Sequence, residues 1–144
     1  MIKNERQYRM TKAHAEKFMQ TLHELATTRK RGVHPVLHKA QIDALKSQLG
    51  DLQRELAEYE TLRSGKRKIV ALESLEELPK TLIQARIAAG LSQEELAAKL
   101  GLKPQQIQRY EATEYQSASL ARVHAVACVL GVKLRHPAEL RLVS

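Results

Sequence analysis

Four polar residues near the middle of the C-terminal half have side chains that can pair with the edges of DNA bases. They are Gln105, Gln106, Gln108 and Arg109. Glutamine can form two hydrogen bonds with adenine and arginine two with guanine, and each such pair is worth about 1–3 kcal/mol of discrimination. Ile107 and Tyr110 are spaced to give a short helix one apolar side, so the polar residues occupy its other sides. The stretch therefore predicts a helix able to lie against a duplex.

A second short helix is predicted directly before it, over residues 92–100. Ser92 and Glu95 have the spacing of a capping box, in which two side chains satisfy backbone N–H groups at the helix start. Its apolar residues recur at helical spacing and are Leu96, Ala97 and Leu100. Gly101 can end this helix in a left-handed conformation, and Pro104 can open the next one. Two short helices joined by a tight turn are a helix-turn-helix signature.

The composition favours an all-α protein. The chain of 144 residues is 43% apolar and only 3% aromatic, and it is rich in residues with high helix propensity. Further helices are predicted before the motif, ending at Gly90, and after it, from Ser119 to Gly131, with Leu120 and Val126 among the core positions of the later helix. Residues 132–144 fit either a short β-arm or a helix with a tail.

The formal charge of +8 favours an anionic partner, and this charge is unevenly distributed. Residues 1–70 hold 15 Lys and Arg against 8 Asp and Glu, whereas residues 71–144 hold 9 against 8. The helix-turn-helix half is thus nearly neutral. We expect any DNA affinity to come from the placement of its charges, from dimerisation or from the basic N-terminal half.

Two longer helices are predicted in residues 1–63, separated from the motif by a linker at 64–78. Their apolar stripes include Phe18, Leu22 and Leu25 in the first and Leu45, Leu49, Leu52 and Leu56 in the second. The second stripe alternates steps of three and four, as in the seam of a coiled coil, and must be buried against something. The two helices can fold back as a hairpin, pair with a second copy, or do both. We expect this region to serve dimerisation or partner binding.

Residues 79–131 resemble the Cro/C1 family of helix-turn-helix proteins, also called the xenobiotic-response-element type. The resemblance is carried by ARIAAGLSQEELAAKLG at 85–101, IQRYE at 107–111 and the helix over 120–130 with its following Gly-Val. It implies a bundle of four or five helices whose third helix enters the major groove. A helical region ahead of such a domain also resembles bacterial antitoxin-type regulators.

The family resemblance implies roles for individual residues. Gln93 would contact backbone phosphate, and Lys103, Gln105 and Arg109 would lie on the reading side of the third helix. Gln106 is a further candidate for base or phosphate contact. Tyr115 and Gln116 in the following loop could hydrogen-bond phosphate, although Glu114 beside them would repel it. Arg86 and Glu111 match a pair that forms a salt bridge between the first and third helices, which is a structural role.

Ordinary interpretations account for the other reactive residues. His34 and His38 are four apart but lack further ligands, so we expect surface histidines and no metal site. Cys128 is the only cysteine, so the chain has no disulfide framework and fits a reducing compartment, and this residue is expected to be buried. No group of residues has the pattern of a catalytic site, and no cofactor is expected. No segment approaches a membrane span, so the expected location is cytoplasmic.

These features predict a sequence-specific DNA-binding transcriptional repressor, not an enzyme, that acts as a homodimer on a double-stranded operator. If the antitoxin resemblance holds, the N-terminal helices bind a cognate toxin and the protein autoregulates its operon. The alternative is a helical adaptor that binds only protein.

Overall fold

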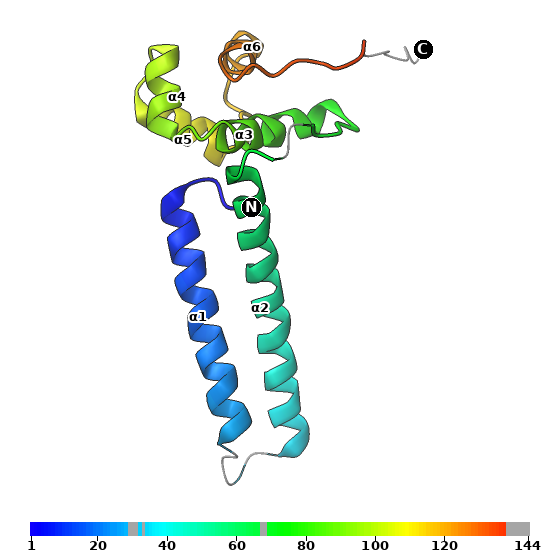
Figure 1. Cartoon of the computed structure of the whole chain (residues 1–144). Coiled ribbons are helices and arrows are strands. Elements are labelled where there is room, and N and C mark those ends of the chain that lie inside the picture. Colours follow the sequence, from blue (N-terminus) through cyan, green and yellow to red (C-terminus); the bar gives the residue numbers. More distant parts are fainter. Residues whose placement is uncertain (29–31, 33, 67–68, 138–144) are drawn as a thin grey trace. The chain divides into compact units, whose positions relative to one another are not determined.

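The computed structural model describes residues 1–28, 32, 34–66 and 69–137. All regular secondary structure in these ranges is helical (Figure 1), which confirms the predicted all-α class. The chain divides into two compact units, Met1–Ser64 and Gly65–Ser144. None of the described helices combines the length and hydropathy that crossing a bilayer requires. The basic run at 29–31 lies outside the described residues.

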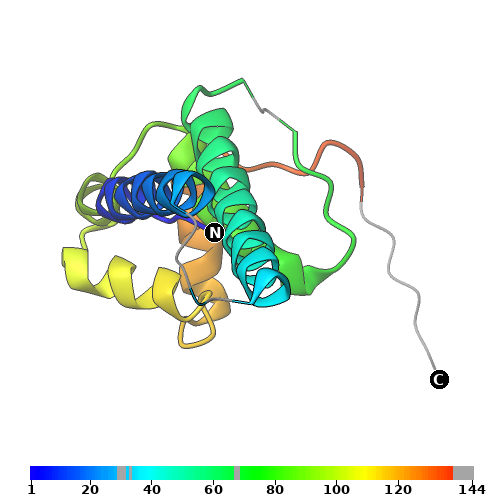
Figure 2. The same ribbon diagram turned by 90° about the horizontal axis from the view of Figure 1, so that it is seen from below.

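The first unit is a hairpin of two long helices, α1 (Glu5–Thr27) and α2 (Pro35–Arg63), which lie side by side in Figures 1 and 2. The side-chain oxygen of Asn4 accepts from the Gln7 N–H at 2.9 Å and begins α1. The His34 ring accepts from the Val36 N–H at 3.3 Å and begins α2 directly before Pro35. Both helices therefore start where side chains satisfy otherwise unpaired donors.

The two apolar stripes meet along the hairpin, so of the arrangements considered the structure contains the folded-back one. The predicted seam residues are all half-buried: Phe18, Leu22, Leu25, Leu45, Leu49, Leu52 and Leu56. Further contacts join the two helices at the open end of the hairpin, where α1 begins and α2 ends. Tyr8 stacks on the buried Tyr59 with ring centroids 5.1 Å apart and donates to Glu60 at 2.6 Å, while Arg63 pairs with Glu5 at 2.8 Å.

Gly50 lies inside α2, where it weakens the helix without filling a structural need. A Cβ built on it would meet nothing within 4 Å. Glycine in a helix interior costs about 0.5–1 kcal/mol relative to alanine. Gly50→Ala is therefore expected to raise the free energy of unfolding of the hairpin by about that amount, measured by urea denaturation followed by circular dichroism.

Gly65→Ala is the control for this substitution. Gly65 has φ +66°, a left-handed backbone conformation that alanine adopts only with strain, so alanine should destabilise the protein. A loss of stability in Gly50→Ala would contradict the prediction.

Within its described residues, the second unit contains four α-helices: α3 (Leu78–Ala88), α4 (Gln93–Leu100), α5 (Pro104–Ala112) and α6 (Leu120–Val129). A single 3₁₀ turn, η1 (Leu75–Glu77), leads directly into α3, so helical structure begins inside the segment predicted as a linker. The core side chains of this unit are completely or almost completely buried: Leu82, Ile83, Ile87, Leu96, Ala97, Ile107 and Val126. No described residue after α6 is in a helix or strand.

The turn between α4 and α5 follows the predicted chemistry. Ser92 accepts from the Glu95 N–H at 3.1 Å, and the Glu95 carboxylate accepts from the Ser92 N–H at 2.7 Å, which confirms the capping box. Gly101 has φ +66° and ends α4 in the left-handed conformation. The Leu102 N–H then donates to the Ala97 carbonyl at 2.9 Å. Local rules therefore fix the turn that sets α5 against α4.

The capping carboxylate also has a pH dependence of known sign. The Ser92 backbone N–H that donates to Glu95 lowers the pKa of this carboxyl group. A lowered folded-state pKa means that the capping contribution is present at neutral pH and is lost as the pH falls through that pKa.

Candidate nucleic-acid interface

Four of the residues predicted to contact DNA lie together on the exposed side of α5. Lys103, Gln105, Gln106 and Arg109 together line one shallow, open depression. Ile107, on the opposite side of α5, is fully buried. The burial of Ile107, and of Glu111 one turn later, therefore turns the polar side of α5 outward.

Gln105 and Arg109 are the side chains best placed to bind a duplex. Both are exposed, and they lie one helical turn apart on α5. Within the described ranges, neither side chain has a hydrogen bond or an ion pair with another residue. Their donors and acceptors therefore need no internal bond to be broken before they can pair with base edges.

Gln106 has a different position in the same depression, because it caps α5. Its side-chain oxygen accepts from the Lys103 backbone N–H at 3.1 Å. Two-point pairing with adenine needs both the amide oxygen and the amide nitrogen. Of the two glutamines, Gln105 alone has both groups available. Gln106 is left with its amide nitrogen, which can donate to a phosphate or a base.

Beneath α5, a buried ion pair connects it to α3. Arg86 Nε lies 2.5 Å from Glu111 Oε1 and Arg86 Nη2 lies 2.8 Å from Oε2, a two-point contact between side chains 2% and 0% exposed. Arg86 Nη1 also donates to the Leu91 carbonyl at 2.7 Å. This is the pair that the family resemblance implied. Its planar geometry restrains the angle of α5 relative to α3.

Gln93 belongs to the same network, in contrast to the phosphate contact predicted for it. Its amide nitrogen donates to Glu111 Oε2 at 2.7 Å, and the side chain is half-buried. Glu111 therefore receives donors from both α3 and α4. In this structure Gln93 positions the start of α4 against α5. Sequence spacing alone gave no sign of this contact, which joins residues 18 positions apart.

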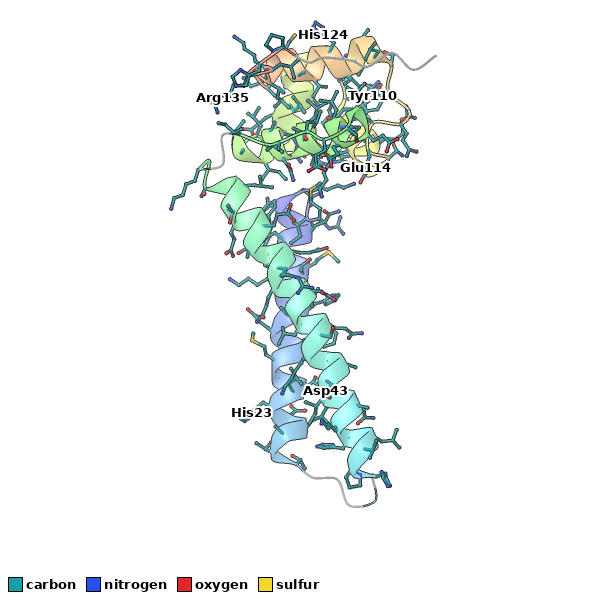
Figure 3. All side chains as sticks on the ribbon, turned by 90° about the vertical axis from the view of Figure 1, so that its right-hand side faces the viewer. His23, Asp43, Tyr110, Glu114, His124 and Arg135 are labelled. Carbon is teal, nitrogen blue, oxygen red and sulfur yellow. The ribbon has the colours of Figure 1, made fainter. Side chains whose placement is uncertain are left out.

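Tyr115 was predicted to reach phosphate, and this prediction is wrong for the structure described. Its side chain is only 3% exposed and its ring stacks on Tyr110, with centroids 6.0 Å apart. The cause is the backbone: Glu114 and Tyr115 have φ of 48° and 59°, and the Tyr115 N–H donates to the Tyr110 carbonyl. This left-handed turn brings the ring back into the core. Gln116 stays exposed, as does Glu114 (Figure 3).

The hydroxyl of Tyr115 is buried without a hydrogen-bond partner in the described part of the chain. Burial raises the pKa of this phenol, with a smaller contribution from the nearby Glu111. Because an unsatisfied buried polar group costs about 1–3 kcal/mol, Tyr115→Phe is expected to raise the free energy of unfolding by about 1 kcal/mol and to leave DNA affinity unchanged. Thermal denaturation and duplex titration measure the two effects.

Tyr110→Phe is the matched control, since its half-exposed ring leaves the hydroxyl more accessible to water and the gain should be smaller. Weaker DNA binding by Tyr115→Phe at unchanged stability would contradict the assignment of Tyr115 to the core. It would indicate that the hydroxyl contacts DNA.

Two predictions for α6 are also wrong. Leu120 was expected in the core but is 81% exposed, and Cys128, expected to be buried, is exposed. The buried side of α6 centres on Val126, and Cys128 lies about 200° around the helix from it. Cys128 lies instead beside His124, which is one turn earlier on the exposed side.

The comparisons with known proteins agree with the geometry of the second unit. Residues 82–136 match a family model described as helix-turn-helix. The match includes the Arg86–Glu111 pair and all four residues that line the depression on α5. No curated protein and no solved structure matched the chain.

Proposed function

Because residues 82–136 form a helix-turn-helix domain of the Cro/C1 type, a family of DNA-binding transcription regulators, we propose that this protein is a sequence-specific repressor. One observation carries the proposal. The side chains of Gln105 and Arg109 are exposed, one turn apart and unengaged by the rest of the described chain. They face outward from a helix whose angle is restrained by the buried network around Glu111.

In this proposal α5 lies in the major groove. Arg109 binds guanine O6 and N7, and Gln105 binds adenine N6 and N7. Lys103, at the exposed start of the helix, supplies positive charge towards the phosphates, as does the N-terminal end of the helix dipole. Gln106 and Gln116 contribute further hydrogen bonds to the phosphate backbone of the DNA.

We further propose that the protein binds as a homodimer. Residues 71–144 hold 9 basic against 8 acidic residues, so one copy brings little net attraction to the phosphates. Two copies double the base contacts and require two half-sites about one helical turn, ~34 Å, apart. The hairpin of residues 1–63 is the proposed dimerisation or partner-binding region, supported by its half-exposed apolar seam.

The finer proposal is an antitoxin that inhibits a toxin and represses its own operon. It is supported by the resemblance to antitoxin-type regulators and by the presence of a separate compact helical unit ahead of the DNA-binding domain. Met10 and Met19 are 54% and 46% exposed on α1 and would add flexible apolar contacts for a protein partner.

Selection from random duplexes, followed by a salt titration, tests the function. A repressor of this type should enrich a palindromic site, and its affinity should fall steeply with salt as phosphate counterions are released. The adaptor interpretation would be correct, and the repressor proposal wrong, if no duplex sequence is enriched and residues 1–63 capture a protein partner.

A further inference from the structure

Four basic side chains lie along the first half of α1, which belongs to the hairpin and not to the helix-turn-helix domain. They are Arg6, Arg9, Lys12 and Lys17, and all four are exposed. At about 100° per residue they fall within an arc of about 140° around the helix. The buried Ala15 lies outside this arc. The four charges therefore form one exposed surface, which we call the α1 basic face.

The charges of the α1 basic face are not neutralised within the described part of the chain. None of its four side chains has an ion pair or a hydrogen bond with another described residue. Two carboxylates at the same end of the hairpin are engaged by other groups. Glu5 pairs with Arg63 at 2.8 Å, and Glu60 accepts from Tyr8 at 2.6 Å. Residues 6–17 contain four basic residues against one acidic residue, Glu16.

The neighbouring helix α2 has the opposite balance of charge. Over its whole length it carries 4 Lys and Arg against 5 Asp and Glu. Two of its basic residues are in ion pairs, Arg54 with Asp51 and Arg63 with Glu5. The excess of unpaired positive charge is therefore a property of α1 and not of the hairpin as a whole.

A polyanion with closely spaced charges is the partner that complements such a face. Double-stranded DNA carries one negative charge per ~1.7 Å of its axis. Arg6 and Lys17 lie about 16 Å apart along α1, at 1.5 Å per residue, so each of the four side chains can meet a different phosphate. The same chain contains a helix-turn-helix domain. Residues 71–144 hold only 9 basic against 8 acidic residues and leave most of the attraction to phosphate to be supplied from elsewhere.

The connection between the two units allows both to contact one duplex. The basic face begins at the open end of the hairpin, where Tyr8 stacks on Tyr59 near the end of α2. Residues 64–74 then lead from α2 to the 3₁₀ turn before α3. A segment of that length spans up to about 36–40 Å when extended, which is as long as a full turn of DNA.

We propose that the α1 basic face binds the phosphate backbone of the duplex whose bases α5 reads. This assignment rests on the DNA binding of the proposed function and adds a second contact surface to it. Each side chain that neutralises a phosphate releases about one condensed counterion. Phosphate contacts carry no direct sequence information. The face therefore adds affinity that depends on salt and leaves the choice of sequence to α5.

A salt titration of the purified chain with a random-sequence duplex tests this. In the variant that combines Arg6→Gln, Arg9→Gln, Lys12→Gln and Lys17→Gln, the slope of log affinity against log salt should fall in magnitude by about 0.9 per contact, or about 3.6 per chain. The ratio of affinities for the selected and the random duplex should stay the same. Far-ultraviolet circular dichroism should also be unchanged, because glutamine is a good helix former.

Two double variants separate the position of the charge from its amount. Arg6→Gln with Lys17→Gln should lower the slope by about 1.8 per chain. Lys39→Gln with Lys46→Gln removes the same charge from exposed positions of α2 and should leave the slope unchanged. An equal change in both variants, or no change in either, would overturn the proposal. Unchanged slopes with lost capture of an acidic protein would also overturn it and would assign the face to that protein.

The same measurements distinguish this proposal from the repressor proposal. Selection of a duplex sequence with unchanged slopes in the α1 variants would leave the repressor standing and remove the phosphate contacts of α1. Absence of any selected sequence, with the expected fall in slope on random duplex, would support the α1 basic face and contradict the repressor.

Discussion

Arg86→Ala is expected to lower the free energy of unfolding of the second unit by about 3–5 kcal/mol, because it leaves the Glu111 carboxylate buried without its main partner. Glu111 is fully buried and receives two hydrogen bonds from Arg86, so water cannot replace the lost contacts. Gln93 retains one donor to Glu111, but a neutral amide cannot offset the charge. A loss of this size is a large share of the stability of a small domain.

Urea denaturation, with hydrogen exchange resolving α3 to α6 from the hairpin, measures this effect. The double variant Arg86→Met with Glu111→Leu provides the comparison, since two apolar residues leave no charge unpaired. It should be clearly more stable than Arg86→Ala alone. If the double variant were as unstable as the single one, the cost would come from lost packing and not from the uncompensated carboxylate.

Arg109→Ala is expected to remove one base preference from each operator half-site. A two-point contact with guanine is worth about 1–3 kcal/mol, so the ratio of specific to non-specific affinity should fall about 5- to 150-fold. The fold should be unaffected, because the Arg109 side chain is exposed and has no partner in the described part of the chain. Competition titrations with the selected duplex and with random duplex give the ratio directly.

Two further variants separate charge from geometry. Arg109→Lys keeps the positive charge but not the planar fork, so non-specific affinity should persist while the base preference is lost. Lys80→Ala removes an exposed charge on α3, away from α5, and should leave specificity unchanged. Equal loss of affinity for every duplex in Arg109→Ala would assign Arg109 to a phosphate and not to a base.

Much of the helix-turn-helix motif could be predicted because its rules are local. The Ser92–Glu95 capping box, the left-handed Gly101 and Pro104 at the start of α5 each depend on residues within one turn of each other. The outward position of Gln105 and Arg109 followed from the spacing of Ile107 and Tyr110 on the same short helix. The Arg86–Glu111 contact was different: it spans 25 positions and was available only through the family resemblance.

Features that depend on distant contacts were decided by the tertiary structure alone. The apolar stripes of residues 1–63 allowed both a hairpin and a two-copy coiled coil, since either buries the same seam. The left-handed turn that buries Tyr115 contains no glycine or asparagine, the residues that usually indicate such a turn. The hydrogen bond from Gln93 to Glu111 depends on where Glu111 lies in the folded chain. The side of α6 that faces the core was likewise set by neighbouring helices, which left Leu120 and Cys128 exposed. The sequence determined where each short helix begins and ends. Packing between the helices decided which of their side chains are buried and which are exposed.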